Sequence, residues 1–261
     1  MSTTKRPIRR WPDEGRTDDD VALEEPLEIR VEGKPVAITM RTPGDDLDLA
    51  AGFLFSEGVI DGADDLIALR HVDQPGNPQG NTVDVLLAGG VEAHREQLER
   101  ATRELYATSS CGLCGKASID RLVVHCDPIQ ATFDLDPEIL LTLPPKLLEQ
   151  QRAFVRTGGL HGAGLFSPDG ELEVAREDIG RHNAVDKVLG WRLRQNRVPV
   201  DDRILVVSSR AGFEVVQKAR VAGVSVVAAA GAASSLAIDL AAESGMTLIG
   251  FLKHDRFVRY T

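Results

Sequence analysis

The stretch that decides the fold is 203–251, RILVVSSRAGFEVVQKARVAGVSVVAAAGAASSLAIDLAAESGMTLIGF. It contains three short, nearly continuous apolar runs, at 204–207, 224–229 and 248–251. Such runs are typical of central strands in a parallel sheet that is covered on both faces. The residues between the runs have the composition of helices. The stretch therefore predicts a three-layer α/β domain.

Upstream of this stretch, the alternation of helix and strand extends back to about residue 107. We expect a strand at 160–166, a helix at 178–197, and a helical segment at 137–157 that is interrupted at Pro144-Pro145. No sequence period indicates a repeat protein. Residues 107–261 are therefore predicted to form one α/β domain.

The first part of the chain has a different texture. Two alternating apolar runs on either side of Gly33-Lys-Pro35 predict a hairpin, and a helix is expected after Thr42-Pro-Gly-Asp45. Further strands are expected at 67–72 and 82–87, so that 21–106 forms a smaller α+β domain. Residues 1–20 contain few apolar side chains and are predicted to be a disordered tail.

Composition restricts the function. The formal net charge is −10 and the sequence pI is about 5.1, which argues against a nucleic-acid-binding surface. No stretch has the roughly 18 to 20 consecutive apolar residues of a membrane helix. The three cysteines and the lack of a secretory signal indicate a cytoplasmic protein without a disulfide framework. An anionic ligand would need a local basic site.

Two of the three cysteines, Cys111 and Cys114, lie in the segment TSSCGLCGK at 108–116. The neighbouring glycines keep the turn free of bulk, and a helix expected at 116–125 would favour the thiolate form of the sulfur. A zinc site needs two more ligands, and only the adjacent His125 and Cys126 are near in sequence. A thioredoxin-like redox role is a second alternative. Nucleophilic sulfur transfer is favoured, with no metal site expected.

Candidate anion-binding residues lie in two further motifs. His161 stands among four glycines at 157–164, where ligand contact or proton transfer competes with a structural role. The motif EDIGRHNAVDK at 177–187 places four hydrogen-bond donors within two turns of a helix start. Ordinary capping by Asp178, with a solvated polar face, is the alternative. These donors suit an anionic group. They are Arg181, His182, Asn183 and Lys187.

Three loops follow the predicted central strands. Loop 208–212 contains Arg210, loop 230–235 contains Ser234, and 251–256 contributes Lys253, His254 and Arg256. Helix N-termini at the carboxyl ends of parallel strands are frequent phosphate sites. Ordinary turn chemistry is the alternative for the first two loops, and a polar C-terminal tail is the alternative for 251–256.

Five of these motifs, at 108–115, 158–164, 177–187, 208–212 and 251–260, occur in the order that is found in the FdhD/NarQ family of formate dehydrogenase accessory sulfurtransferases. The resemblance runs from about residue 27 to the C-terminus. It implies a cytoplasmic protein that accepts sulfur from a cysteine desulfurase. The sulfur passes to the molybdenum bis(molybdopterin guanine dinucleotide) cofactor before the cofactor enters formate dehydrogenase.

The resemblance also implies roles for residues. Cys111 would carry the persulfide and Cys114 would assist. The cofactor, which is the bound substrate, would contact a segment near the C-terminus, and GDP is expected to occupy the same site. That segment comprises Phe251, Leu252, Lys253, His254, Asp255 and Arg256. Further candidate contacts are His161, Arg181, Arg210 and Ser234.

The family resemblance implies that the second domain has a cytidine deaminase-like fold and that the protein is a homodimer. The counterpart of the deaminase zinc motif, LHGAG at 160–164, lacks the catalytic glutamate, so deamination is not expected. A cofactor-binding chaperone of apo formate dehydrogenase, without covalent sulfur transfer, is the alternative function.

Overall fold

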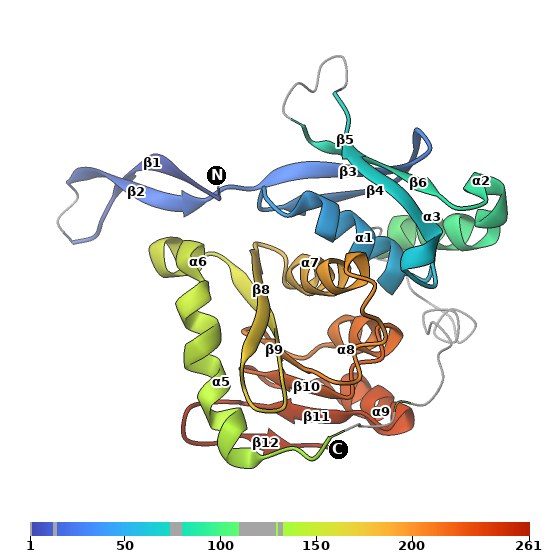
Figure 1. Ribbon diagram of the computed structural model, residues 1–261. Helices are drawn as coiled ribbons and strands as arrows, with labels where there is room; N and C mark the ends of the chain where they lie inside the picture. Colours follow the sequence, from blue (N-terminus) through green and yellow to red (C-terminus); the bar gives the residue numbers. More distant parts are fainter. Residues whose placement is uncertain (1, 13–14, 74–79, 110–128, 130–132) are drawn as a thin grey trace.

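The computed structural model describes residues 2–12, 15–73, 80–109, 129 and 133–261, and the fold has two layered units joined face to face (Figure 1). The cysteine turn, the helix expected at 116–125 and Cys126 lie outside the described residues. Among the residues that the structure does describe, no helix is long and apolar enough to cross a membrane.

The first unit is a four-stranded sheet in the order β4-β3-β6-β5. Its strands are β3 (Glu25–Val31), β4 (Lys34–Arg41), β5 (Leu66–His71) and β6 (Thr82–Leu87). Its helical elements are α1 (Asp46–Ser56), η1 (Ala63–Asp65), α2 (Gly90–Ala93) and α3 (Arg95–Ser109). The inward side chains of the sheet, such as Leu27, Ile29 and Val83, share a buried core with α1. This arrangement confirms the predicted α+β unit.

The second unit contains a six-stranded sheet in the order β12-β11-β10-β9-β7-β8. Strands β9, β10 and β11 are parallel, while β7, β8 and β12 are antiparallel to their neighbours. The strands are β7 (His161–Phe166), β8 (Leu172–Asp178), β9 (Ile204–Val207), β10 (Val226–Ala229), β11 (Thr247–Gly250) and β12 (Val258–Arg259).

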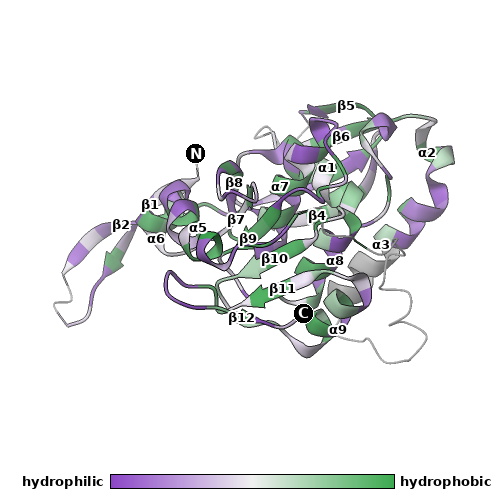
Figure 2. Cartoon of the chain, turned by 60° about the horizontal axis from the view of Figure 1, so that its bottom comes forward, coloured by the Kyte–Doolittle hydropathy of each residue, from purple (hydrophilic) through white to green (hydrophobic). Residues whose placement is uncertain are grey.

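Helices cover both faces of this sheet, because alternate side chains along each central strand pack against helices on opposite sides. Leu205 and Val207 pack with helices α7 (Arg181–Arg194), α8 (Phe213–Val221) and α9 (Ser235–Ser244). Ile204 and Val206 pack instead with α5 (Pro137–Gln150), which is followed by α6 (Arg152–Thr157). Figure 2 shows the apolar strands between these layers. The predicted three-layer α/β class is therefore confirmed.

Several predicted elements differ from the structure. Helix α5 continues through Pro144 and Pro145 and ends before Gln151. Three leucines of α5 are buried against the sheet, and this packing outweighs the hydrogen bonds that proline cannot make. Helix α7 begins at Arg181, because 172–178 forms β8 instead of leading into a helix. The predicted domain boundary at 106 falls inside α3.

The N-terminal residues form an antiparallel hairpin, although the sequence predicts a disordered tail. It consists of β1 (Thr3–Arg9) and β2 (Arg16–Ala22). Basic residues of β1 face acidic residues of β2, as in the pairs Lys5↔Asp20 and Arg6↔Asp19. Such opposite-charge pairs stabilise a hairpin that contains few apolar residues.

The two units are held together by a close crossing of α1 and α7. A Cβ atom on Gly52 would lie 1.9 Å from the carbonyl oxygen of Asp186, so the helices touch through backbone. Beside this crossing, Lys218 Nζ lies 2.9 Å from carboxylate oxygens of both Asp186 and Glu57 and donates to Ser56 Oγ. Burial opposes the charge of Lys218, but the two carboxylates outweigh it and raise the lysine pKa. The interface is thus tightly packed, and one buried lysine is shared there by two carboxylates.

Candidate functional site

The loops that follow β9, β10 and β11 meet at the carboxyl edge of the parallel sheet. Ala211 and Ala233 form an isolated parallel bridge, and Gly231 N donates to Ser209 O at 3.0 Å. Phe251 N donates in turn to Gly231 O at 2.9 Å. The structure therefore brings together 208–212, 230–235 and 251–256, which are three separate sequence motifs.

His161 lies at the same edge because β7 runs antiparallel to β9. The next residue, Gly162, donates its N–H to Ser208 Oγ at 2.8 Å, and Ser208 N donates to Gly162 O at 2.9 Å. Burial, followed by the nearby charges of Arg181 and His182, lowers the pKa of His161. The imidazole is consequently held more neutral than a free histidine, beside two potential cations.

The start of α7 contributes Arg181 and His182 to this edge. His182 Nε2 lies 2.5 Å from Glu214 Oε2 at the start of α8. This hydrogen bond lowers the pKa of Glu214, against an opposing effect of burial. Sequence reasoning did not select Glu214. The sequence feature that could have identified Glu214 is its position as an acidic residue in the first turn of the helix after loop 208–212.

The rest of the 177–187 motif has a structural role. Lys187 Nζ lies 2.7 Å from Asp178 Oδ2, and both side chains are buried. Asn183 donates to Asp178 Oδ1 and to the Met40 carbonyl in the first unit. The predicted row of four donors is therefore reduced to two at the site, Arg181 and His182.

The 251–256 segment is a tight turn with mixed exposure. Phe251 has φ +53°, and Lys253 N donates to Arg256 O at 2.8 Å. The Leu252 side chain is buried in the core beneath α5, whereas the other five side chains are exposed. Arg256 lies 3.6 Å from Asp255. The charged side chains of this turn are thus presented to solvent beside the other two loops.

Arg210 and Ser234 complete the set of predicted contacts. Arg210 is exposed. Ser234 Oγ accepts a hydrogen bond from Ala237 N at 3.3 Å and so caps α9. A Cβ atom on Gly231 would lie 3.0 Å from the Arg210 Cα atom, which shows how closely the loops approach one another. The edge combines a helix N-terminus with exposed basic side chains, a donor set that fits phosphate groups.

The structure describes only the residues on either side of the cysteine turn, namely Ser109 and Ile129. Helix α3 ends at Ser109, and Ile129 N donates to the carbonyl of Ser244 at 2.8 Å, at the end of α9. Cys111 and Cys114 lie outside the described residues. Among the side chains that are described, no group of three or more histidines, cysteines or acids is placed to bind a metal.

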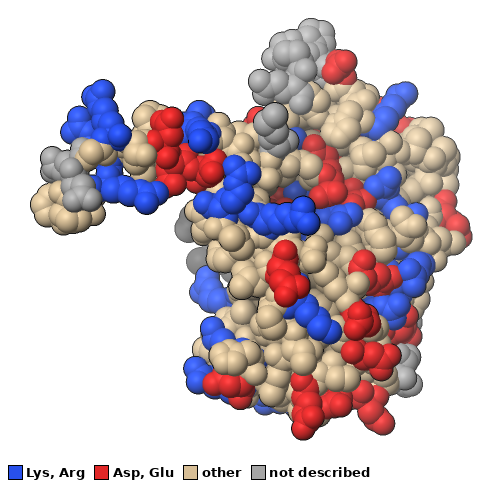
Figure 3. Space-filling view, turned by 60° about the vertical axis from the view of Figure 1, so that its left-hand side comes forward, with Lys and Arg blue, Asp and Glu red and all other residues tan. Residues whose placement is uncertain are grey.

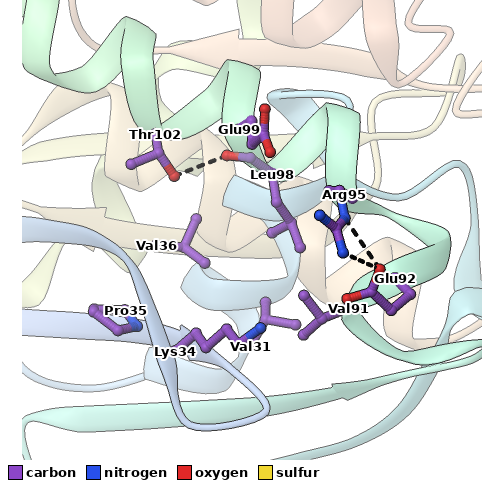
Figure 4. Close-up of a pocket in the computed structure, with 10 residues that line it drawn as sticks. All are labelled: Val31, Lys34, Pro35, Val36, Val91, Glu92, Arg95, Leu98, Glu99 and Thr102. Carbon is purple, nitrogen blue, oxygen red and sulfur yellow. Dashed lines mark hydrogen bonds and ion pairs between the residues drawn. The ribbon is translucent and has the colours of Figure 1, made fainter.

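A cavity of about 540 Å³ lies in the first unit and does not include any predicted site residue. Figure 4 shows apolar side chains such as Val36, Val91 and Leu98 along it, with the bonded pair Arg95 and Glu92 at one end. The arginine lowers the pKa of this glutamate. The cavity is therefore separate from the basic edge described above.

Comparison with known proteins gives consistent results. The family model described as FdhD/NarQ matches residues 22–261. The chain is 52% identical to the sulfur carrier protein FdhD of Streptomyces avermitilis over 245 residues, covering 90% of this chain and 84% of that protein. It is 46% identical to the Nocardia farcinica protein of the same name over 267 residues, covering 100% and 93%.

A solved structure supports the fold. The crystal structure of a protein from Desulfotalea psychrophila, described as a formate dehydrogenase accessory protein, superimposes with a TM-score of 0.75. The match covers 99% of this chain and 96% of that chain, at 24% sequence identity. At this identity the likeness supports the shared architecture of both units.

Proposed function

Since this chain belongs to the FdhD/NarQ family, we propose that it is a sulfur carrier that acts in the maturation of formate dehydrogenase. The relatives that are 46–52% identical are named sulfur carrier proteins. We further propose that the sulfur comes from a cysteine desulfurase in the cytoplasm and passes to the molybdenum bis(molybdopterin guanine dinucleotide) cofactor. This cofactor is the substrate of the transfer.

The observation that carries the proposal is the basic edge on an acidic protein. Three separate loops converge there, and four of their exposed side chains are basic, namely Arg210, Lys253, His254 and Arg256, against a single exposed carboxylate, Asp255. The formal net charge of the chain is −10, so an anionic nucleotide would be repelled elsewhere. The converged loops provide the local exception that the phosphates of a guanine dinucleotide require.

The proposed chemistry uses both cysteines. The Cys111 thiolate attacks the terminal sulfur of a donor persulfide, forming the Cys111 persulfide and releasing the donor thiolate. The Cys114 thiolate then attacks the Cys111 sulfur, and the terminal sulfur leaves as hydrosulfide toward the metal. Two electrons come from Cys114, so the step leaves a Cys111–Cys114 disulfide, which an external thiol reduces.

Intact mass spectrometry tests the carrier step. The protein is incubated with a cysteine desulfurase and cysteine and is weighed before and after reduction. We expect a reducible gain of about one sulfur atom in the wild type and in Cys114→Ala, and no gain in Cys111→Ala. A Cys111→Ala variant that still activates formate dehydrogenase would support the chaperone alternative and refute covalent carriage.

Nucleotide binding tests the second part of the proposal. Calorimetry with GDP is expected to give at least tenfold weaker binding for Arg210→Ala and Lys253→Ala, because each removes a cation from the converged loops. Lys34→Ala, which removes an exposed lysine at the start of β4, is the matched control. Equal affinities in all three variants would place the nucleotide elsewhere.

A further inference from the structure

Glu214 is an acidic side chain at an edge where the proposed ligand is an anion. It lies in the first turn of α8, two residues after the end of loop 208–212, which is about 3 Å along the helix axis. Its side chain is 52% exposed, so the carboxylate reaches solvent beside that loop. A carboxylate at this position repels the phosphates that the basic side chains attract. Its presence therefore needs a separate explanation.

An ordinary surface ion pair is the simplest explanation, because acidic and basic side chains lie side by side over the face shown in Figure 3. On the β1–β2 hairpin, for example, Arg10 lies 3.1 Å from Asp19. Such exposed pairs contribute little to stability. Glu214 differs from them, because the side chain that contacts its carboxylate is a histidine, His182, that is only 28% exposed.

The contact with His182 uses one oxygen of the carboxylate, since His182 Nε2 lies 2.5 Å from Glu214 Oε2. This contact is the main cause of the lowered pKa of Glu214, and the charges of Lys218 and Arg181 add to it, so the group is ionised at neutral pH. In the described part of the chain, no donor contacts the second oxygen, Oε1. The carboxylate is thus held through one oxygen, and the other is available to accept hydrogen bonds.

A base that carries donors suits this second oxygen. Guanine presents two donors side by side, N1–H and the amino group at C2, and hydrogen bonds from such groups to an ionised carboxylate are strong. Adenine presents an unprotonated N1 at the same place, and a carboxylate repels this nitrogen. A site that is built to bind a donor rejects an analogue without one, because the polar group of the site is then left unpaired. An ionised carboxylate therefore distinguishes guanine from adenine.

We propose that Glu214 selects guanine at this site by accepting hydrogen bonds from N1–H and the C2 amino group, and that His182 positions its carboxylate. The inference rests on the proposed function, since it requires the nucleotide to occupy the three converged loops. Arg210 precedes Glu214 by four residues, in the loop that leads into α8. One loop and the helix turn after it thus supply a cation for the phosphates and a carboxylate for the base.

Calorimetry of the full chain with GDP and ADP tests this selection. We expect the wild type to bind GDP at least about tenfold more tightly than ADP. Glu214→Gln should bind GDP at least about tenfold more weakly than the wild type, and ADP no more weakly. The direction of the change separates two roles, because a carboxylate that acted only by repelling phosphates would, when removed, strengthen the binding of both nucleotides. Glu96→Gln removes an exposed glutamate from the first turn of α3 and is the matched control.

Xanthosine diphosphate provides a second measurement, because a carbonyl oxygen replaces the C2 amino group of guanine in its base. The amide of the Glu214→Gln variant can accept from N1–H and donate to this carbonyl. The variant should therefore bind xanthosine diphosphate more tightly than GDP, whereas the wild type should show the opposite preference. Such a gain also demonstrates that the variant is folded.

Two substitutions of His182 test its positioning role. His182→Gln keeps an N–H donor that can reach the carboxylate, and it should retain the preference for GDP over ADP. His182→Ala removes the donor and should reduce this preference. Equal preferences in both variants would refute the positioning role.

The possible failures can be told apart. A wild type that binds GDP and ADP equally would overturn the selection by Glu214, and so would a Glu214→Gln variant in which both affinities change by the same factor. If binding in these cases still depends on Arg210 and Lys253, the proposed nucleotide site stands and only the role of Glu214 is lost. A wild type that binds neither nucleotide would overturn the selection together with the proposed cofactor site.

Discussion

Replacing Gly52 by alanine tests how the two units are joined, because two physical effects predict opposite results. In an isolated helix, alanine is more favourable than glycine by about 1 kcal/mol. In the structure, however, the new Cβ atom would lie 1.9 Å from the carbonyl oxygen of Asp186 and 2.9 Å from the Gly190 nitrogen. Relief of this overlap requires helices α1 and α7 to separate, since both opposing atoms belong to backbone.

The expected size follows from the cost of overpacking, about 1 to 3 kcal/mol for a well-packed site. The rigid backbone partners place Gly52→Ala at the upper end, about 3 kcal/mol, and helix propensity returns about 1 kcal/mol. We therefore expect a net loss of about 2 kcal/mol in the free energy of unfolding. For a chain of this size, that loss corresponds to a decrease of roughly 4 to 8 °C in Tm.

Urea unfolding followed by circular dichroism, with a parallel thermal scan, measures this loss. Gly62→Ala is the matched control, because a Cβ atom at Gly62 would meet nothing within 4 Å and its φ of −170° is ordinary extended backbone. The control should stay within about 0.5 kcal/mol of the wild type. If Gly52→Ala is as stable as the wild type or more stable, helix propensity dominates and the close crossing is refuted.

Four other substitutions have expected outcomes. Lys218→Met should lower the free energy of unfolding, measured in urea, by about 3 to 5 kcal/mol, because it leaves the buried Asp186 carboxylate without a cation. Glu214 has a lowered pKa through its bond to His182, so the stability it contributes is present above the ordinary pKa and is lost as pH falls below about 4.5. The urea midpoints of wild type and Glu214→Gln should therefore converge in acid, and a constant difference would contradict this. Lys187→Met should destabilise the fold without changing the GDP affinity of the folded protein. Arg181→Met should weaken GDP binding without changing stability. Urea unfolding and calorimetry on both variants measure these two effects.

The central strands could be predicted from the sequence because both of their faces are buried. Runs such as 204–207 contain only apolar residues, and the structure places β9 at these positions. The edge strand β8 was missed because it has no continuous apolar run. β8 has the sequence LEVARED, and an edge strand with one neighbour can carry charged side chains at most positions. The hairpin at 3–22 was missed because its strands pair through charges.

The location of the site could also be predicted in part. The sequence predicts parallel central strands directly before 208–212, 230–235 and 251–256, and loops at the carboxyl ends of parallel strands share one edge of a sheet. The antiparallel direction of β7 places His161 beside these loops, and no sequence pattern indicates this direction. Glu214 became recognisable only through its contact with His182.

The 177–187 motif shows why a motif alone does not separate function from stability. Its donors belong to the same short helical start, yet Arg181 lies at the basic edge while Lys187 bonds to buried Asp178 and to the Thr42 carbonyl. Thr42 is 145 residues away in sequence, so no local pattern could reveal this contact. Helix α7 therefore bonds to the first unit through Asn183 and Lys187 and adds Arg181 to the basic side chains of the site. A family resemblance across this segment identifies the helix, but only the burial of each side chain assigns its role.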